Sequence, residues 1–159
     1  MYKVIFGEIV SILKNKHGLA APIINIHLPK RAKFERYLQS VMANELKTKY
    51  ADTEIEKKYP NNKNCHVDVY ANKTFIELKT PNTNFGGSGR NITQNIQGII
   101  NDIQKLRNAN VDGVVAFVLF PIDNNSNYLQ HVDKVKKQLG NNLYNECVLG
   151  DFYVFSAKV

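Results

Sequence analysis

Three charged side chains lie close together in the segment His66–Thr80, HVDVYANKTFIELKT, and their types and spacing suit hydrolytic chemistry. Asp68 lies on one short run of alternating apolar and polar residues, and Glu77 and Lys79 lie two residues apart on the next. Residues two apart on a β-strand share a face. A hairpin formed by these runs therefore presents two carboxylates and a lysine together, the groups used in metal-assisted hydrolysis of a phosphodiester.

Four aliphatic side chains predict how the two runs pair. A two-residue turn at Asn72 and Lys73 puts all four side chains on one buried face. If the pairing register shifted by one residue, the aliphatic side chains of one strand would point to solvent. Burial of this face therefore selects the register with the two-residue turn. The four residues are Val67, Val69, Ile76 and Leu78.

In that register Asp68 lies directly opposite Glu77, and Lys79 lies opposite His66. Directly opposed residues have Cβ atoms about 4.5–5.5 Å apart, a distance at which two carboxylates repel each other. Mg²⁺, for which Mn²⁺ can substitute, would relieve that repulsion because it prefers oxygen ligands, and the backbone carbonyl of Leu78 offers another oxygen. Lys79 can orient or deprotonate the attacking water and offset developing charge. The alternative is a solvated hairpin face on which Lys79 pairs with one carboxylate.

The series Asp68, hairpin turn, Glu77-Leu78-Lys79 resembles the active-site signature of the PD-(D/E)XK, or restriction-endonuclease-like, nuclease superfamily. The expected order of elements over about 30–122 (helix, three-stranded meander, helix, strand) is similar to that family's core. The resemblance implies that Asp68 and Glu77 hold Mg²⁺ and that Lys79 acts on the attacking water. It also implies catalytic side chains on the neighbouring helices: Glu35, or else Glu45, before the sheet, and Gln94 or Gln97 after the E-x-K strand.

The chain of 159 residues carries 21 Lys and Arg against 14 Asp and Glu, a formal net charge of +7. Such an excess favours an anionic partner, with nucleic acid first and an acidic membrane second. The alternative is that these Lys and Arg residues are simply exposed, in a basic cluster and in a surface loop, and this is equally consistent with the sequence. The predicted phosphate contacts are Lys30, Arg31 and Lys33 at the start of a helix, and Arg90 in the Gly-rich loop 80–91.

Hydrophobic periodicity predicts a single domain over residues 1–159, of α/β (α+β) class, with a central mixed β-sheet flanked by helices. By the resemblance, its core is restriction-endonuclease-like. A continuous apolar run at 111–122 predicts a strand that is covered on both faces. The expected parts are a helical extension at 2–17, the core at about 30–122, and a helix and a strand within 128–159.

Two cysteines, Cys65 and Cys147, form neither a disulfide framework nor a metal-binding spacing, so we expect reduced thiols and a cytoplasmic protein. Glu8 interrupts the apolar run near the start, and that run is too short to span a bilayer. We therefore expect an amphipathic helix there, and no membrane partner.

Together these features predict an Mg²⁺-dependent deoxyribonuclease that hydrolyses DNA phosphodiester bonds, with a restriction-type endonuclease as the first expectation. A Holliday-junction resolvase, a repair nuclease of the same fold and a catalytically silent nucleic-acid-binding module are the alternatives. The silent module would have no need of the intact set Asp68, Glu77 and Lys79. The small size favours junction substrates or a homodimer, because one such domain cuts only one strand.

Overall fold

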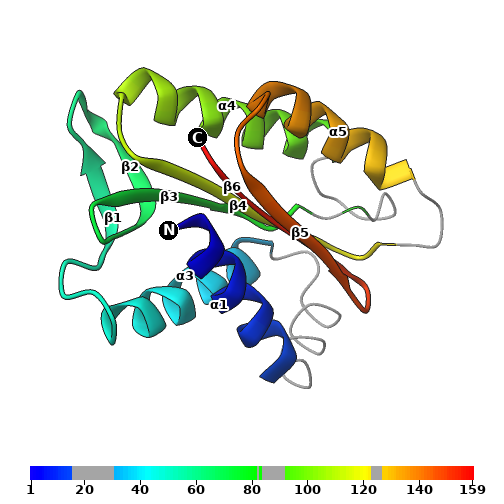
Figure 1. Ribbon diagram of the computed structural model, residues 1–159, viewed down its shortest axis with the longest axis horizontal. Helices are drawn as coiled ribbons and strands as arrows, with labels where there is room; N and C mark the ends of the chain where they lie inside the picture. The colour runs from blue at the N-terminus through cyan, green and yellow to red at the C-terminus, as the bar shows by residue number, and fades with distance from the viewer. Residues whose placement is uncertain (16–30, 82, 84–91, 123–126) are drawn as a thin grey trace.

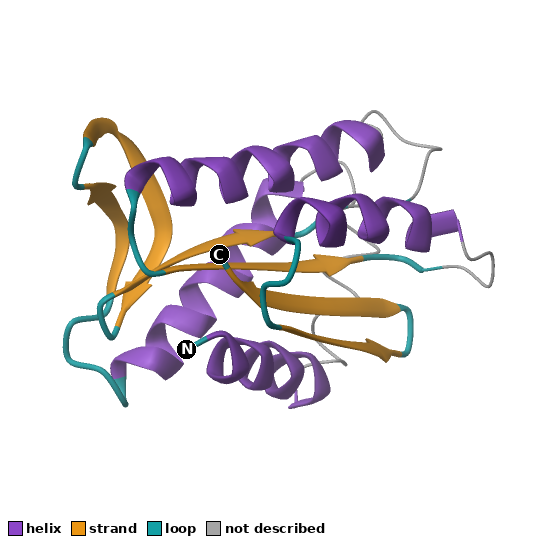
Figure 2. Cartoon of the chain, turned by 45° about the horizontal axis from the view of Figure 1, so that its top comes forward, coloured by secondary structure: helices purple, strands orange, loops and turns teal. Residues whose placement is uncertain are grey.

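The computed structural model describes residues 1–15, 31–81, 83, 92–122 and 127–159. In these ranges four helices and six strands form three layers, with the sheet in the middle (Figure 1, Figure 2). The helices are α1 (Tyr2–Asn15), α3 (Arg31–Lys47), α4 (Ile92–Ala109) and α5 (Asn127–Leu139). The strands are β1 (Glu54–Tyr59), β2 (Asn62–Ala71), β3 (Thr74–Lys79), β4 (Gly113–Leu119), β5 (Tyr144–Leu149) and β6 (Phe152–Lys158).

The sheet is mixed, with the strand order β1-β2-β3-β4-β6-β5. The β3–β4 pair is parallel and the other neighbouring pairs are antiparallel. Helices α4 and α5 cover one face of the sheet, and α1 and α3 cover the other (Figure 1, Figure 2). The predicted α+β class, with a mixed sheet between helices, is therefore confirmed.

Strand β4 separates two hydrophobic cores. All of its residues are buried, as the continuous apolar run predicted for a strand covered on both faces. Alternate side chains enter the two cores because successive residues of a strand point to opposite sides. Those in the core of α1 and α3 are Val114, Ala116 and Val118, and those in the core of α4 and α5 are Val115, Phe117 and Leu119.

Helix α1 packs against β6, β5 and α3 and contributes part of the core, including Ile5 and Ile9. An ion pair between Glu8 and Lys49 links α1 to the segment that follows α3. The predicted amphipathic helix is thus present, with its apolar side on the sheet. None of the described helices combines the length and the apolarity needed to cross a lipid bilayer.

The prediction of a single strand after α5 is wrong, because β5 precedes β6 and pairs with it in a hairpin. Each face of β5 mixes polar and apolar residues: Glu146 and Val148 share the more exposed face, and Asn145 and Cys147 share the other. The strand therefore lacks the period-two pattern that marks a half-buried strand. Its pairing with β6 comes from the tight turn at Gly150, whose φ of 56° suits glycine.

The predicted two-residue turn between β2 and β3 is confirmed. Asn72 and Lys73 have φ angles of 48° and 60°, and the flanking residues Ala71 and Thr74 pair directly. Positive φ at both positions defines the turn type whose twist matches a β-hairpin. The carboxylate of Asp52 accepts hydrogen bonds from the N–H groups of Asn72 (2.7 Å) and Lys73 (2.9 Å), which stabilise the turn from outside the hairpin.

The backbone at Lys73 gives a direct test of this turn. A left-handed conformation costs an L-residue about 1–2 kcal/mol, and glycine avoids that cost. We therefore expect Lys73→Gly to raise the free energy of unfolding by about 0.5–1 kcal/mol in urea denaturation. Lys73→Ala is the control, because it removes the same side chain but keeps Cβ, and it should change stability by less than about 0.5 kcal/mol. A glycine variant no more stable than the alanine variant would contradict the turn geometry.

Candidate active site

Strands β2 and β3 stop pairing at Val69 and Ile76, where their ladder ends. Next to this point the carboxylate of Asp68 accepts a hydrogen bond from the N–H of Leu78 (2.7 Å). In a regular antiparallel ladder, the N–H of Leu78 would donate to a backbone carbonyl of the neighbouring strand. Here the side chain of Asp68 accepts that hydrogen bond instead. The expected direct ladder pairing of Asp68 with Glu77 is therefore absent from the described structure, and β3 continues in its parallel pairing with β4.

The expectation that all four hairpin aliphatics share one face is wrong for Val67. Val69 packs in the core of α1 and α3, whereas Val67 packs on the opposite side with Leu106 of α4. The face alternation therefore breaks at Asp68, between the two valines. Glu56, on the neighbouring strand β1, has a φ of 53° and lies between the residues that pair with Val69 and Val67, so both strands depart from regular geometry at this level.

The ammonium group of Lys79 lies among three carboxylates from different elements. Its Nζ atom is 3.5 Å from Asp102 Oδ2 on α4, 3.6 Å from Glu35 Oε1 on α3 and 3.8 Å from Asp68 Oδ2 on β2. His66, which was expected opposite Lys79, pairs within the β1–β2 ladder instead. The fold therefore brings two residues of the hairpin together with the helix carboxylate that the resemblance implied.

The carboxylate of Glu77 forms the deeper half of the same group and is 1% exposed. Its Oε1 atom accepts a hydrogen bond from the hydroxyl of Tyr59 (2.6 Å) and lies 2.6 Å from Nζ of Lys105. The same ammonium is 3.2 Å from Oδ1 of Asp102, so Asp102 joins the two halves. We call this group the carboxylate–lysine cluster; its members are Glu35, Asp68, Glu77, Asp102, Lys79 and Lys105.

The cluster contains four carboxyl groups and two ammonium groups, so it carries two excess negative charges when all are ionised. Burial, and then repulsion from Asp102 and Asp68, raise the pKa of Glu77 to about 8. Burial is also the main reason why the pKa of Glu35 is raised. In the metal-free protein at neutral pH, the cluster therefore relieves its charge by keeping a proton on Glu77.

For Lys79, burial and the neighbouring charges act on the pKa in opposite directions. Burial alone would lower its pKa, but the surrounding carboxylates, that of Asp68 first, outweigh burial and raise it. Lys79 is therefore an ammonium at neutral pH in the metal-free protein. In this state it can donate hydrogen bonds and offset negative charge, but it cannot take a proton from water.

One oxygen of the cluster has no hydrogen-bond partner in the described structure. This atom, Oδ2 of Asp102, is buried, and Nζ of Lys79 lies 3.5 Å from it, an ion-pair distance that is too long for a good hydrogen bond. A buried carboxylate oxygen that accepts no hydrogen bond is costly, and a hard cation would satisfy it. Within the described ranges, however, no three Asp, Glu, His or Cys side chains are already arranged to hold a metal ion. The oxygen donors suit such an ion in type, but two ammonium groups, those of Lys79 and Lys105, lie among them.

Two neighbouring groups hold the cluster in position. The side-chain amide of Gln39, one turn after Glu35 on α3, donates to the backbone carbonyl of Asp68 (2.7 Å), where β2 leaves the ladder. Glu35 accepts a hydrogen bond from the N–H of Thr80 (3.3 Å) at the end of β3. Helix α3 is thereby tied to both strands at the point where they separate.

Sequence reasoning missed Asp102, Lys105 and Tyr59. Asp102 carried a detectable signal, because it lies three residues after Ile99 and four before Leu106, within the apolar stripe of α4. A charged residue in such a stripe needs a partner. Tyr59 carried no such signal, because a tyrosine at the end of a strand is common.

The other predicted residues lie elsewhere on α3 and α4 or outside the described ranges. Gln94 and Gln97 are exposed in the first turns of α4, and the amide of Gln97 donates to Asn101 (3.0 Å). Glu45 is exposed near the end of α3. Lys30 and Arg90 lie outside the described residues; Arg31 and Lys33 begin α3, but their side chains are not described.

No protein-family model, curated protein or solved structure matched the chain. The functional assignment therefore depends on the geometry and charge of the cluster.

The raised pKa of Glu77 predicts how stability depends on pH in EDTA. Between about pH 4.5 and 8 the folded protein holds a proton on Glu77 that the unfolded chain has lost, so this group lowers stability as pH rises. Glu77→Gln removes that dependence. We expect the free energy of unfolding of the variant, relative to that of the wild type, to rise by about 1 kcal/mol or more between pH 5 and pH 8. Urea denaturation of both proteins at the two pH values measures it.

Glu146 provides a control of opposite sign. Hydrogen bonds from Lys136 and Tyr153 outweigh the effect of burial and lower its pKa, so its contribution to stability is present at neutral pH and is lost as pH falls. Glu146→Gln should therefore cost more stability at pH 7 than at pH 4. If the difference in free energy of unfolding between Glu77→Gln and the wild type does not change between pH 5 and 8, burial and repulsion do not raise the pKa of Glu77 as described.

Proposed function

We propose that the protein is a metal-dependent phosphodiesterase that cleaves DNA and has a restriction-endonuclease-like core. The observation that carries the proposal is the meeting of Asp68, Glu77 and Lys79 with Glu35 in one partly buried, carboxylate-rich cluster. A solvated hairpin face would leave these side chains apart and exposed. Perturbed ionisable groups gathered in this way are typical of catalytic sites.

The order of elements supports the same assignment. Helix α3, the meander β1–β2–β3, helix α4 and strand β4 follow one another as in the family that the hairpin resembles. The separation of β2 from β3 at Asp68 frees the ends of both strands for a site between α3 and α4. The remaining elements (α1, α5, β5 and β6) extend this core on both faces and at one edge of the sheet.

The proposed metal is Mg²⁺, with Mn²⁺ as a substitute. Asp68, Glu77 and the backbone carbonyl of Leu78 would hold it, and Asp102 would add a carboxylate with an unsatisfied oxygen. When bound, the ion would offset the excess negative charge and lower the pKa of a bound water. This donor set is all oxygen, as a hard cation requires.

The protein's own groups have distinct roles in the proposed reaction. Lys79, held as an ammonium, would orient the attacking water and offset charge on the phosphate. Glu35 would position Lys79, to which it is paired, and Gln39 would fix the backbone of Asp68. Tyr59 and Lys105 would hold the carboxylate of Glu77 in place.

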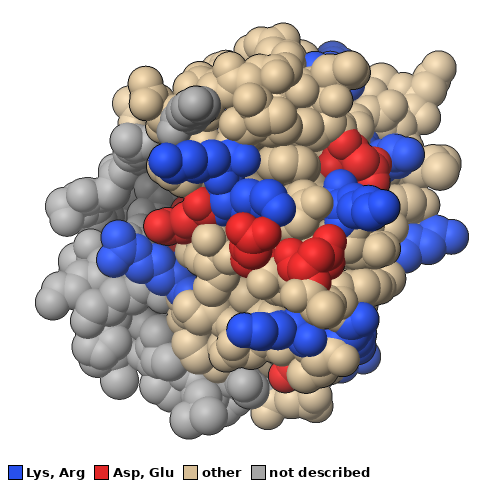
Figure 3. All heavy atoms as spheres, turned by 90° about the vertical axis from the view of Figure 1, so that its left-hand side faces the viewer, with Lys and Arg blue, Asp and Glu red and all other residues tan. Residues whose placement is uncertain are grey.

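The proposed substrate is DNA because the chain carries a net charge of +7. Figure 3 shows Lys and Arg side chains around a group of acidic side chains on the face that lies at the left of Figure 1. Lys30, Arg31, Lys33 and Arg90 remain proposed phosphate contacts. A single domain of this kind cuts one strand, so cleavage of both strands of a duplex would need a homodimer.

A catalytically silent nucleic-acid-binding module is the second candidate. One observation favours it: Lys79 and Lys105 already pair with every carboxylate of the cluster, so the described structure satisfies much of its charge without a metal. Cleavage assays on duplex, single-stranded and junction DNA, with Mg²⁺ or Mn²⁺, separate the candidates. They also distinguish a restriction-type endonuclease from a junction resolvase or a repair nuclease.

The proposal predicts that cleavage requires Mg²⁺ or Mn²⁺ and stops in EDTA. Lys79→Ala should lower the cleavage rate at least about a hundredfold, since it removes a charge beside the reacting group, while DNA binding is retained. Lys137→Ala, on the exposed side of α5, is the matched control and should cleave at the wild-type rate. Binding without cleavage of any substrate would leave the silent module, and full activity in the Lys79→Ala protein would exclude the proposed role of Lys79.

A further inference from the structure

A pocket of about 410 Å³ opens beside the cluster, between helix α4 and the turn that joins β1 to β2. Tyr59 and Lys105 form part of its lining, and both contact the carboxylate of Glu77. The ring of Tyr59 stacks on Phe75 with a centroid separation of 5.3 Å, which fixes this wall. The pocket therefore shares a wall with the candidate active site. Its volume lies within the range of small-ligand sites.

Carboxamide side chains dominate the remaining lining. Those on α4 follow one stripe of the helix, because residues three, four and seven apart lie on the same face. Within the described part of the chain, Gln104 and Asn108 form no side-chain hydrogen bonds, so their amides are available to a ligand. The carboxamides are Asn61 and Asn62 from the β1–β2 connection, and Asn101, Gln104 and Asn108 from α4.

We infer that this pocket binds a nucleobase of the DNA strand that the active site cuts. The inference rests on the proposed function, because it takes DNA as the substrate. A carboxamide presents a donor and an acceptor side by side, which matches the edge of a base in a bidentate pair. The charge of the lining also favours a neutral ligand. Among the lining residues whose side chains the structure describes, Lys105 alone is charged, and it is already paired with Glu77 and Asp102.

The shared wall connects base binding to the reaction. A base held against Lys105 and Tyr59 would lie next to the carboxylate of Glu77, so the nucleotide it belongs to would be close to the bond that is cut. The pocket would thus position the strand and select the base beside the cleavage point. Gln104 and Asn108, on the exposed face of α4, are placed to make the selective contacts.

Binding of a strand without bases tests the inference when the preferred base is unknown. The full chain, in Ca²⁺ to limit cleavage, is titrated against labelled single-stranded DNA of mixed sequence and against an abasic strand of the same length. We expect the wild type to bind the abasic strand at least about tenfold more weakly, on the scale of a base-specific contact. The double variant Gln104→Ala, Asn108→Ala should reduce this ratio to below about twofold, with similar affinity for the abasic strand. Gln130→Ala, an exposed carboxamide on α5, should keep the wild-type ratio.

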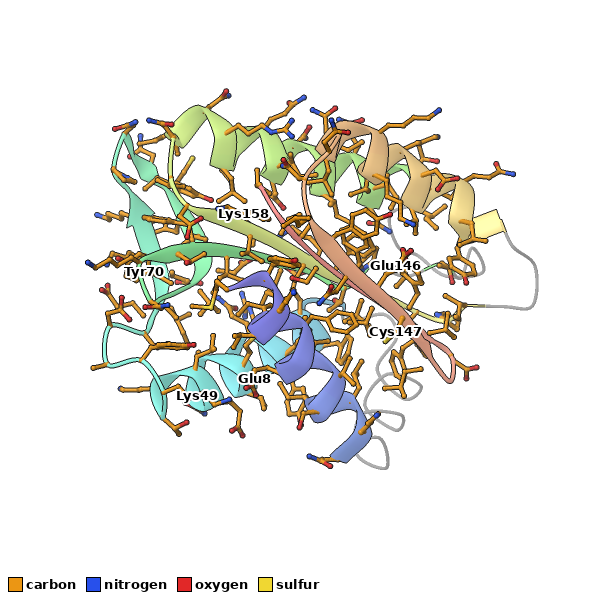
Figure 4. All side chains as sticks on the ribbon, viewed as in Figure 1. Glu8, Lys49, Tyr70, Glu146, Cys147 and Lys158 are labelled. Carbon is orange, nitrogen blue, oxygen red and sulfur yellow. The ribbon has the colours of Figure 1, made fainter. Side chains whose placement is uncertain are left out.

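The two cysteines allow a second measurement in the unmodified protein. Cys65 lines the pocket, whereas Cys147 lies on β5 at the opposite edge of the sheet (Figure 4). Base-containing DNA should slow the alkylation of Cys65 by iodoacetamide several-fold, and the abasic strand should slow it less. The alkylation of Cys147 should be the same with either strand.

The outcomes separate this inference from the proposed function. Base-dependent binding that the double variant loses, in a protein that cleaves nothing, would support the pocket and exclude the nuclease. Metal-dependent cleavage with an unchanged binding ratio in the double variant would exclude the pocket and leave the nuclease. Equal affinity of the wild type for both strands, or no DNA binding at all, would also overturn the inference.

Discussion

The carboxylate of Glu77 is almost completely buried, and the arrangement of the surrounding residues follows from that constraint. Removing an ionised carboxylate from water costs several kcal/mol unless charge partners and hydrogen bonds replace the lost hydration. Tyr59 and Lys105 supply one hydrogen bond and one ammonium, but Asp102 and Asp68 add repulsion. The balance raises the pKa of Glu77 to about 8, so the group is poised between binding a proton and binding another cation.

The partners of Glu77 come from elements that are distant in the sequence. Tyr59 ends β1, and Lys105 and Asp102 come from α4, which connects β3 to its parallel neighbour β4. A parallel pair requires such a crossover helix, and the helix returns over the sheet above β3. The same two partners, Tyr59 and Lys105, form a wall of the carboxamide-lined pocket. Support of the buried carboxylate and contact with a substrate would therefore depend on one shared surface.

The sequence predicted those features that local rules determine. The turn at Asn72 and Lys73 follows from the length of the loop and the aliphatic pattern, and strand β4 follows from a continuous apolar run. The pairing of Asp68 and Lys79 in one site required only their positions on a hairpin.

Features that depend on tertiary contacts could not be predicted in this way. Val67 changes face because the strands depart from regular geometry at Asp68 and Glu56, and no residue type marks that break. Strand β5 is visible only through its pairing with β6. Asp102 joins the cluster because α4 packs across β3, which sequence periodicity alone does not orient relative to the hairpin.

Calorimetric titration of the metal-free protein with Mn²⁺ tests most directly whether the excess carboxylate charge forms a cation site. We predict that the wild type binds Mn²⁺ at the cluster and that Asp68→Asn, which removes one anionic ligand, weakens binding at least about tenfold. Glu146→Gln, which changes a carboxylate on β5 outside the cluster, should bind as the wild type does. Absence of Mn²⁺ binding by the wild type, or equal affinity in the Asp68→Asn protein, would contradict a cation site at the cluster.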